Sequence, residues 1–136
     1  MGFEELQHTA DWAVRVWGGS LEDLFVQAAA AMYALTGARR ARTEHVIQSA
    51  SGWGPDHESL LVVFLSELNF RLEQQDVAFD AIRIRIEPDS GGYRYEARLD
   101  GGPATIMNKA IKAVTYHNMS ILRTGDGLEV QIVFDV

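Results

Sequence analysis

The sequence contains no cysteine, and this absence removes two kinds of chemistry. Disulfide bonds cannot form, and no thiolate is available as a metal ligand or a redox group. Any bound metal ion must therefore be held by oxygen atoms or by the imidazole rings of the four histidines.

Long apolar runs are missing as well. No stretch approaches the roughly 18 consecutive apolar residues that a membrane-spanning helix needs. Met1–Leu6 is acidic and has neither the basic start nor the apolar stretch of a secretory signal peptide. We therefore expect a cytoplasmic protein that does not associate with membranes. Its 136 residues, 47% of them hydrophobic, predict a single domain over residues 1–136.

The sequence also lacks a surplus of positive charge. It has 12 Lys and Arg against 19 Asp and Glu, which gives a formal net charge of -7. Nonspecific affinity for nucleic acids comes mainly from neutralising phosphates, so we expect no direct tight binding of nucleic acid. Two groups of arginines are candidates for a local basic patch, although charge runs of this kind are usually solvated and interspersed with acids. These groups are Arg39, Arg40 and Arg42, and Arg83, Arg85, Arg94 and Arg98.

Three common catalytic motifs are absent. Gly91-Gly92 and Gly101-Gly102 are not followed by the Lys-Ser/Thr of a phosphate-binding loop, so both pairs predict turns. No two histidines have the i, i+4 spacing of a helical zinc site, and no serine stands in a Gly-x-Ser-x-Gly elbow. The sequence therefore does not support a P-loop nucleotide site, a zinc hydrolase or a serine hydrolase.

Two segments have the spacing of amphipathic helices. Ser20 is a suitable N-cap for a helix that begins at Leu21, and Gly37 suits the left-handed position after its end. A second helix is predicted over residues 60–72, with capping residues near Asp56. We expect both apolar stripes to face the core. They comprise Leu21, Leu24, Phe25, Ala28, Met32 and Leu35, and Leu60, Leu61, Phe64, Leu65, Leu68 and Leu72.

Strand patterns surround the two helices. Alternation of apolar and polar residues predicts a hairpin of strands 82–87 and 93–99, joined by the turn 88–92. Residues 100–108 have no periodicity and are expected to form a loop. Further strand segments are predicted at 12–17, within 43–51, at 113–116, at 119–122 and at 128–136. This order predicts an α+β fold in which two amphipathic helices pack on an antiparallel or mixed β-sheet.

Two aspartates lie near opposite ends of the chain, Asp11 before the first predicted strand and Asp135 beside Val136. Both have ordinary explanations, because an aspartate before a strand accepts hydrogen bonds in a turn and one near a chain end is usually solvated. Alternation in the last strand turns Asp135 away from its most apolar face. Should the fold unite the two ends, both carboxylates and an oxygen of Val136 would offer the ligands that Ca²⁺ and Mg²⁺ prefer.

Four motifs, taken together and in this order, resemble those of the archease family. They are His8-Thr9-Ala10-Asp11, then Gly-Gly-Ser-Leu-Glu-Asp-Leu-Phe at 18–25, Ile-Lys-Ala-Val-Thr-Tyr-His at 111–117, and the terminal Phe134-Asp135-Val136. The resemblance spans almost the whole chain and implies one archease-like domain.

The resemblance also implies a function. Archeases are protein cofactors of the RtcB-type RNA ligase, which joins RNA ends in tRNA splicing and RNA repair. They promote guanylylation of the ligase's active-site histidine and multiple turnover, and they are not themselves the catalyst. The family carries a divalent cation, so the resemblance implies a site for Ca²⁺, with Mg²⁺ or Mn²⁺ as alternatives.

Matching the motifs residue by residue implies metal ligands at Asp11, Asp135 and Val136. Lys112 matches a lysine thought to be functional in the family. The remaining candidates for supporting roles are Gln7, His8 and His117. Gln7 stands where the family commonly has an acidic residue, so it offers an amide oxygen without charge, and Ala110 stands where a glutamate is usual.

Two other functions are compatible with the residues. A small acidic domain of this kind is also consistent with a general chaperone or a modulator of other RNA-processing enzymes. An autonomous metal-dependent hydrolase would need a base near the metal, and His8 or His117 is the only obvious choice.

Overall fold

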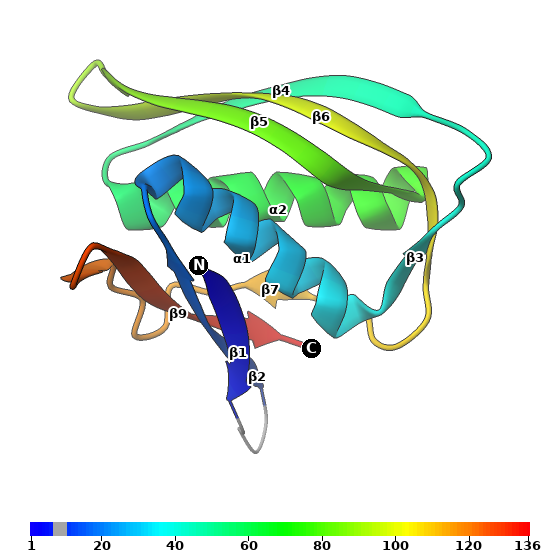
Figure 1. Ribbon diagram of the computed structural model, residues 1–136, viewed down its shortest axis with the longest axis horizontal. Coiled ribbons are helices and arrows are strands. Elements are labelled where there is room, and N and C mark those ends of the chain that lie inside the picture. The colour runs from blue at the N-terminus through cyan, green and yellow to red at the C-terminus, as the bar shows by residue number, and fades with distance from the viewer. Residues whose placement is uncertain (7–10) are drawn as a thin grey trace.

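The computed structural model describes residues 1–6 and 11–136, in which two helices lie between two antiparallel sheets (Figure 1). The elements are β1 (Gly2–Leu6), β2 (Trp12–Gly18), α1 (Leu21–Thr36), β3 (Ala38–Arg40), β4 (Val46–Gly54), α2 (His57–Gln75), β5 (Val77–Asp89), β6 (Gly92–Ile106), β7 (Ala113–Val114), β8 (Leu122–Thr124) and β9 (Gly127–Asp135). The predicted α+β class is confirmed. Within these ranges, neither helix is long and apolar enough to cross a membrane.

The first sheet brings the two ends of the chain together. Its strand order is β1-β2-β9-β7, and β8 also pairs with β9. The second sheet has the order β3-β6-β4, with β5 also paired to β6. Helix α1 contacts β2 of the first sheet and β5 of the second, while α2 contacts β4, β5 and β6 on one side and β7 on the other. Each helix is therefore covered by sheet on two sides, which explains why both are rich in apolar residues.

The ends of α1 agree with the prediction. The Ser20 hydroxyl accepts a hydrogen bond from the Asp23 amide at 3.1 Å, and the Asp23 carboxylate accepts one from the Gly19 amide at 2.9 Å. The first bond satisfies an amide that the first helical turn leaves unpaired, and the second ties the residue before the N-cap to the helix. Gly37 follows the helix with φ 64°, the left-handed conformation that glycine adopts most easily.

The loop predicted at residues 100–108 is wrong. Strand β6 continues through this segment to Ile106 and pairs with β3 and β5. Gly101 and Gly102 lie within the strand and do not end it. Neighbouring backbone passes so close to both residues that a side chain would not fit. A β-carbon on Gly101 would lie 1.9 Å from the carbonyl oxygen of Ala78. Glycine is needed here for close approach rather than for a turn.

Short strands were predicted less well than long ones. Neither β1 nor β3 is predicted from the sequence, and of the predicted strand 119–122 only Leu122 lies in a strand, as the start of β8. Residues 116–119 instead form a turn, closed by a 3.0 Å hydrogen bond from the Met119 amide to the Tyr116 carbonyl. Asn118 has φ 51° in this turn, a conformation that asparagine tolerates better than most residues.

Candidate metal site at one end of the first sheet

The pairing of three strands places both aspartates at the same end of the first sheet. Strand β9 lies between β2 and β7, and Trp12 of β2 pairs with Phe134. Asp11 and Asp135 are the residues next to this last pair, one on each chain segment. On the other side of β9, Ala113 pairs with Asp135, and the Lys112 amide donates to the Asp135 carbonyl oxygen at 2.7 Å. Asp11, Asp135 and Lys112 thus belong to the same end of the first sheet, although 124 positions separate the two aspartates in the sequence of 136.

The side chains at this end remain accessible. Asp135 and Lys112 are exposed, and Asp11 and Val136 are half-buried. Among residues 1–6 and 11–136, no three His, Asp or Glu side chains gather closely enough to hold a metal ion by themselves. A cation here would therefore rely on two carboxylates, an oxygen of Val136 and water.

This set of donors fits a hard divalent cation. Carboxylate, carbonyl and water oxygens are the ligands that Ca²⁺ and Mg²⁺ take, and two carboxylates neutralise a dication. The predicted supporting residues Gln7 and His8 lie outside the described residues. Asp11 follows them directly in the sequence.

A second lysine that sequence reasoning missed lies near the same end. The Lys109 ammonium is 6.0 Å from the centre of the Trp12 ring, within reach of a cation–π interaction. Trp12 follows Asp11 in the sequence, so this contact brings Lys109 to the same end of β2. Nothing in the local pattern pointed to Lys109, because residues 107–112 have no periodicity and only folding brings them to β2.

The segment that carries Lys112 is fixed to α2 by one buried hydrogen bond. The amide nitrogen of the Asn69 side chain donates to the Ile111 carbonyl oxygen at 2.9 Å. Asn69 is 7% exposed and Ile111 is fully buried, so water cannot replace this bond. Helix α2 therefore positions Lys112 without contacting the site itself.

Replacing Asn69 with leucine should loosen this segment. The substitution leaves the Ile111 carbonyl buried without a donor, a loss of about 1–3 kcal/mol. We expect the Lys112 amide to exchange its hydrogen faster than in the wild-type protein. Amides of the β5–β6 hairpin should still exchange only through global unfolding of the protein. Gln74→Leu, at an exposed position on the same helix, is the matched control. Unchanged exchange at Lys112 in the Asn69 variant would show that this bond does not hold the segment.

His117 lies farther along the chain from this end. It is exposed in the turn 116–119, and its amide donates to the Thr115 hydroxyl at 3.3 Å. Thr115 is bonded to Val133, two residues before Asp135, so the chain moves away from Asp135 as it proceeds toward His117. The backbone does not bring His117 to the same place as Asp11 and Asp135, and its supporting role stays a prediction.

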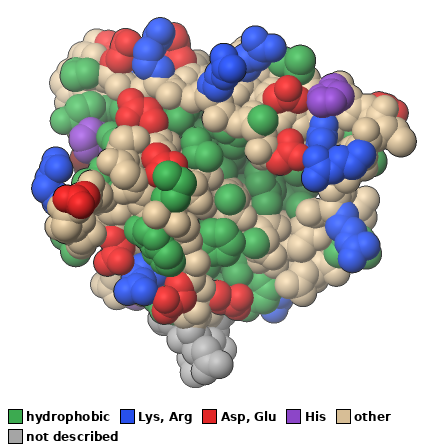
Figure 2. Space-filling model, in the orientation of Figure 1, with side chains coloured by type: hydrophobic (Ala, Val, Ile, Leu, Met, Phe, Trp, Pro, Cys, Tyr) green, Lys and Arg blue, Asp and Glu red, His purple; other side chains and the backbone are tan. Residues whose placement is uncertain are grey.

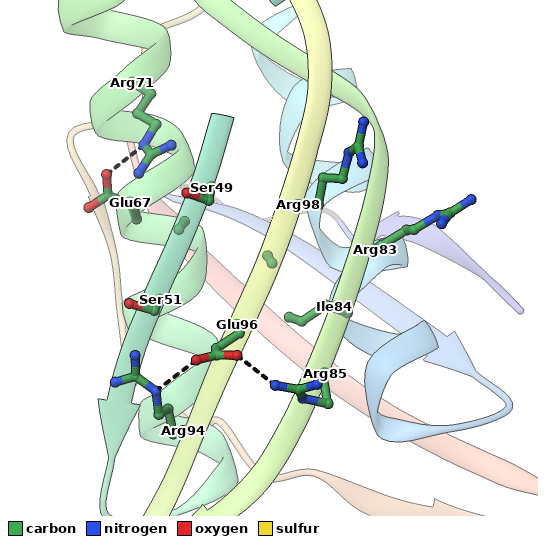
Figure 3. Close-up of a pocket in the computed structure, with 12 residues that line it drawn as sticks. Ser49, Ser51, Glu67, Arg71, Arg83, Ile84, Arg85, Arg94, Glu96 and Arg98 are labelled. Carbon is green, nitrogen blue, oxygen red and sulfur yellow. Dashed lines mark hydrogen bonds and ion pairs between the residues drawn. The ribbon is translucent and has the colours of Figure 1, made fainter. Parts of the chain in front are cut away.

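The arginine group of the β5–β6 hairpin, Arg83, Arg85, Arg94 and Arg98, is exposed and interspersed with acids. On the outer face of the second sheet, Arg85 contacts Glu96 at 2.7 Å and Arg94 contacts the same carboxylate at 3.5 Å (Figure 3). Arg83 lies directly opposite Arg98, and acids stand beside Arg98 on the same face. This is the pattern of a solvated surface rather than of a phosphate-binding stripe.

Comparison with known proteins decides the family. The model of the "Archease protein family (MTH1598/TM1083)" matches residues 3–136. The chain belongs to the archease family. It is 34% identical to the protein archease of Methanosarcina acetivorans, over 98% of this chain and 95% of that protein. It is 32% identical to the archease of Methanopyrus kandleri, with both chains covered completely.

Solved structures support the same assignment. The solution structure of Methanobacterium thermoautotrophicum protein 1598 matches with a TM-score of 0.73 and 25% identity, over 99% of both chains. A crystal structure from Thermotoga maritima, described as an archease and possible chaperone, matches with a TM-score of 0.64 and 23% identity, over 98% of this chain and 96% of that one. The similarity to the Thermotoga structure shows a shared fold only. Archease relatives are named as proteins or as a possible chaperone, not as enzymes.

Proposed function

We propose that this protein is a metal-binding cofactor of an RtcB-type RNA ligase, which it activates by promoting ligase guanylylation and multiple turnover in tRNA splicing and RNA repair. It acts in the cytoplasm and does not itself catalyse ligation. Membership of the archease family supports the proposal. The observation that supports the site is the register of β2, β9 and β7, in which Trp12, the neighbour of Asp11, pairs with Phe134, and Ala113, the neighbour of Lys112, pairs with Asp135.

The residues at this end have complementary tasks in the proposal. Asp11, Asp135 and an oxygen of Val136 hold the cation, for which Ca²⁺ is the first choice and Mg²⁺ or Mn²⁺ the alternatives. When bound, the cation supplies positive charge that attracts phosphate or carboxylate oxygens of the partner. Lys112 and Lys109 add cationic hydrogen-bond donors for the same groups.

A test of the site is the pair of variants Asp11→Asn and Asp135→Asn, which keep side-chain size and remove charge. We expect the wild-type protein to speed guanylylation of the RtcB-type ligase from the same organism, and each variant to lose most of this stimulation. Thermal unfolding with Ca²⁺, Mg²⁺ and Mn²⁺ provides an independent measurement. A cation at 100 times its dissociation constant stabilises the native state by about 2.7 kcal/mol, so the wild-type midpoint rises and those of the variants do not.

Asp126→Asn is the matched control, because Asp126 is an exposed aspartate in the turn before β9, at the opposite end of that strand. It should keep both stimulation and the cation-dependent shift. Full stimulation by both site variants would rule out the metal site. A chaperone role, as named for the Thermotoga relative, would instead give suppressed aggregation of unrelated proteins with no effect on ligase guanylylation.

A further inference from the structure

Strand β4 forms an edge of the second sheet over its whole length. It pairs with β6 from Val46 to Gly54, and among the described residues no strand pairs with its other side. Figure 3 shows Ser49 and Ser51 on this edge strand, with β6 between it and β5. In an antiparallel pair, each strand directs only part of its amide and carbonyl groups at its partner. The remaining groups of β4 therefore point outward and can pair with a further strand.

The sequence of β4 does nothing to prevent such pairing. Its nine residues, Val-Ile-Gln-Ser-Ala-Ser-Gly-Trp-Gly, include no charged side chain and no proline. Two large apolar side chains on its outer face are exposed, Ile47 to 56% and Trp53 to 44%. Edge strands of soluble proteins are usually short, or carry charges or proline that block pairing with another chain. A long uncharged edge with exposed apolar side chains is typical of a strand that pairs between chains.

The other edge strands of the described chain are protected. Strand β5, at the opposite edge of the second sheet, presents Arg83, Arg85 and Glu87 to solvent. Figure 2 shows charged side chains of both signs along the upper margin of the molecule, where β5 runs in Figure 1. Strand β1 of the first sheet carries Glu4 and Glu5, and strands β3, β7 and β8 have only two or three residues each. Strand β4 is therefore the one long edge without charge in the part of the chain that the structure describes.

A second copy of the chain fits this edge, because β4 can pair with itself in antiparallel register. Exposure alternates along the strand, so that odd-numbered residues from Ile47 to Trp53 face outward and even-numbered ones face the interior. Two copies that form one continuous sheet must pair residues of the same face, since a slip of one residue turns every side chain over. A register centred on Ala50 meets this condition and pairs all nine residues of both strands.

The side chains that meet in this register are compatible. On the outer face, Ile47 of one copy stands opposite Trp53 of the other, and Ser49 stands opposite Ser51. An aliphatic side chain opposite an aromatic one and a pair of hydroxyl groups are both favourable across strands. The Trp53 side chain is already held in place, because its Nε1 donates to the Asp89 carbonyl oxygen at 2.8 Å. No charge meets a like charge within the paired strands, although each chain has a net charge of -7.

We propose that the protein forms a symmetric dimer in which β4 pairs antiparallel with β4 of a second copy. The pairing joins the two second sheets into one continuous sheet. A two-fold axis beside Ala50 relates the copies, so both present the same surface and the assembly closes at two chains. Strand β4 contains none of the proposed metal ligands, and the inference therefore goes beyond the proposed function and does not depend on it.

The test places charge at Ser49 and Ser51, which are exposed and face each other across the proposed contact. The double variant Ser49→Lys with Ser51→Lys sets lysine against lysine on either side of the two-fold axis. The double variant Ser49→Glu with Ser51→Glu sets glutamate against glutamate in the same way. Like charges directly opposite one another destabilise a strand pair. In sedimentation equilibrium, we expect a wild-type dimer and a dissociation constant at least tenfold higher for each variant alone.

A mixture of the two variants is the decisive sample. Lysine then stands opposite glutamate at both positions, so we expect the equimolar mixture to recover dimers that neither variant forms by itself. Ser120→Lys with Thr124→Lys adds the same charge at exposed positions outside β4 and should dimerise like the wild-type protein. Thermal unfolding of each variant shows that the chain is folded. Amides of wild-type β4 should also exchange more slowly as the protein concentration rises.

Three outcomes would overturn the inference. The first is a wild-type protein that stays monomeric throughout the concentration series, or a lysine variant that dimerises as well as the wild-type protein. The second is a dimer whose exchange protection lies outside β4. The third is a monomeric protein whose β4 amides become protected only when the ligase is added, which would assign the edge to another protein. Stimulation of the ligase is measured separately, so none of these results decides the proposed function.

Discussion

Replacing Gly101 with alanine is expected to destabilise the protein by about 3 kcal/mol, because the added methyl group has no room. Its carbon would lie 1.9 Å from the Ala78 carbonyl oxygen and 2.7 Å from the Cα atom of Phe79. Both neighbours are backbone atoms of β5, so no side chain can rotate away. The backbone of β5 or β6 must move, which disturbs pairing at the centre of the second sheet.

The movement also disturbs the contacts of Arg40. The Gly101 carbonyl accepts a 2.6 Å hydrogen bond from Arg40, and Arg40 in turn contacts Asp80. Thermal unfolding is the direct measurement, and we expect the midpoint to fall by about 10 °C. Gly19→Ala provides the matched control, since nothing lies within 4 Å of a β-carbon there and φ is not positive. A Gly101 variant as stable as the Gly19 variant would show that the two strands can separate without loss.

Replacing Phe64 with alanine is expected to be at least as severe, with a loss of about 3–5 kcal/mol. Phe64 is fully buried in α2, and its ring centre lies 5.6 Å from that of Phe25 in α1 and 5.2 Å from that of Tyr95 in β6. The second contact is edge to face, a favourable geometry for aromatic rings. Truncation removes these contacts and leaves a cavity where both helices meet the second sheet.

Urea unfolding at equilibrium would measure this loss, which is a large part of the 5–15 kcal/mol by which ordinary domains are stable. Phe70→Ala is an unusually close control, because it makes the same substitution on the same helix, at a side chain that is 56% exposed. Its effect should stay within about 0.5 kcal/mol. Similar losses in the two variants would mean that Phe64 is not at the centre of the core.

Helices and the long hairpin could be predicted because their signals are local. Ser20 and Gly37 mark the ends of α1 through hydrogen bonds and backbone conformations that involve neighbouring residues alone. The alternation of apolar and polar residues in β5 and β6 is also a local signal. Prediction failed at Gly101, because the same residue type serves turns and close approach, and only the partner backbone distinguishes the two.

The candidate site could also be predicted only in part from the sequence. The types of Asp11, Asp135 and Lys112 and their family motifs were visible in the sequence, and so was the hard-cation chemistry that such oxygen donors favour. Their convergence was not visible, because it depends on β9 pairing with β2 from the start of the chain and with β7 from its later part. Lys109 and Asn69 are identified only by spatial contacts, that of Lys109 with Trp12 and that of Asn69 with Ile111.

By itself, therefore, the sequence determined the α+β class, the two helices, the absence of thiol chemistry and the archease motifs. These properties follow from residue types and short-range periodicity, which act within a few residues. The tertiary structure decided that two sheets enclose the helices, that β6 runs through its glycines, and that β4 lies at the edge of its sheet. Each of these depends on which surfaces meet across long separations in the chain, and packing, not local propensity, selects the partner.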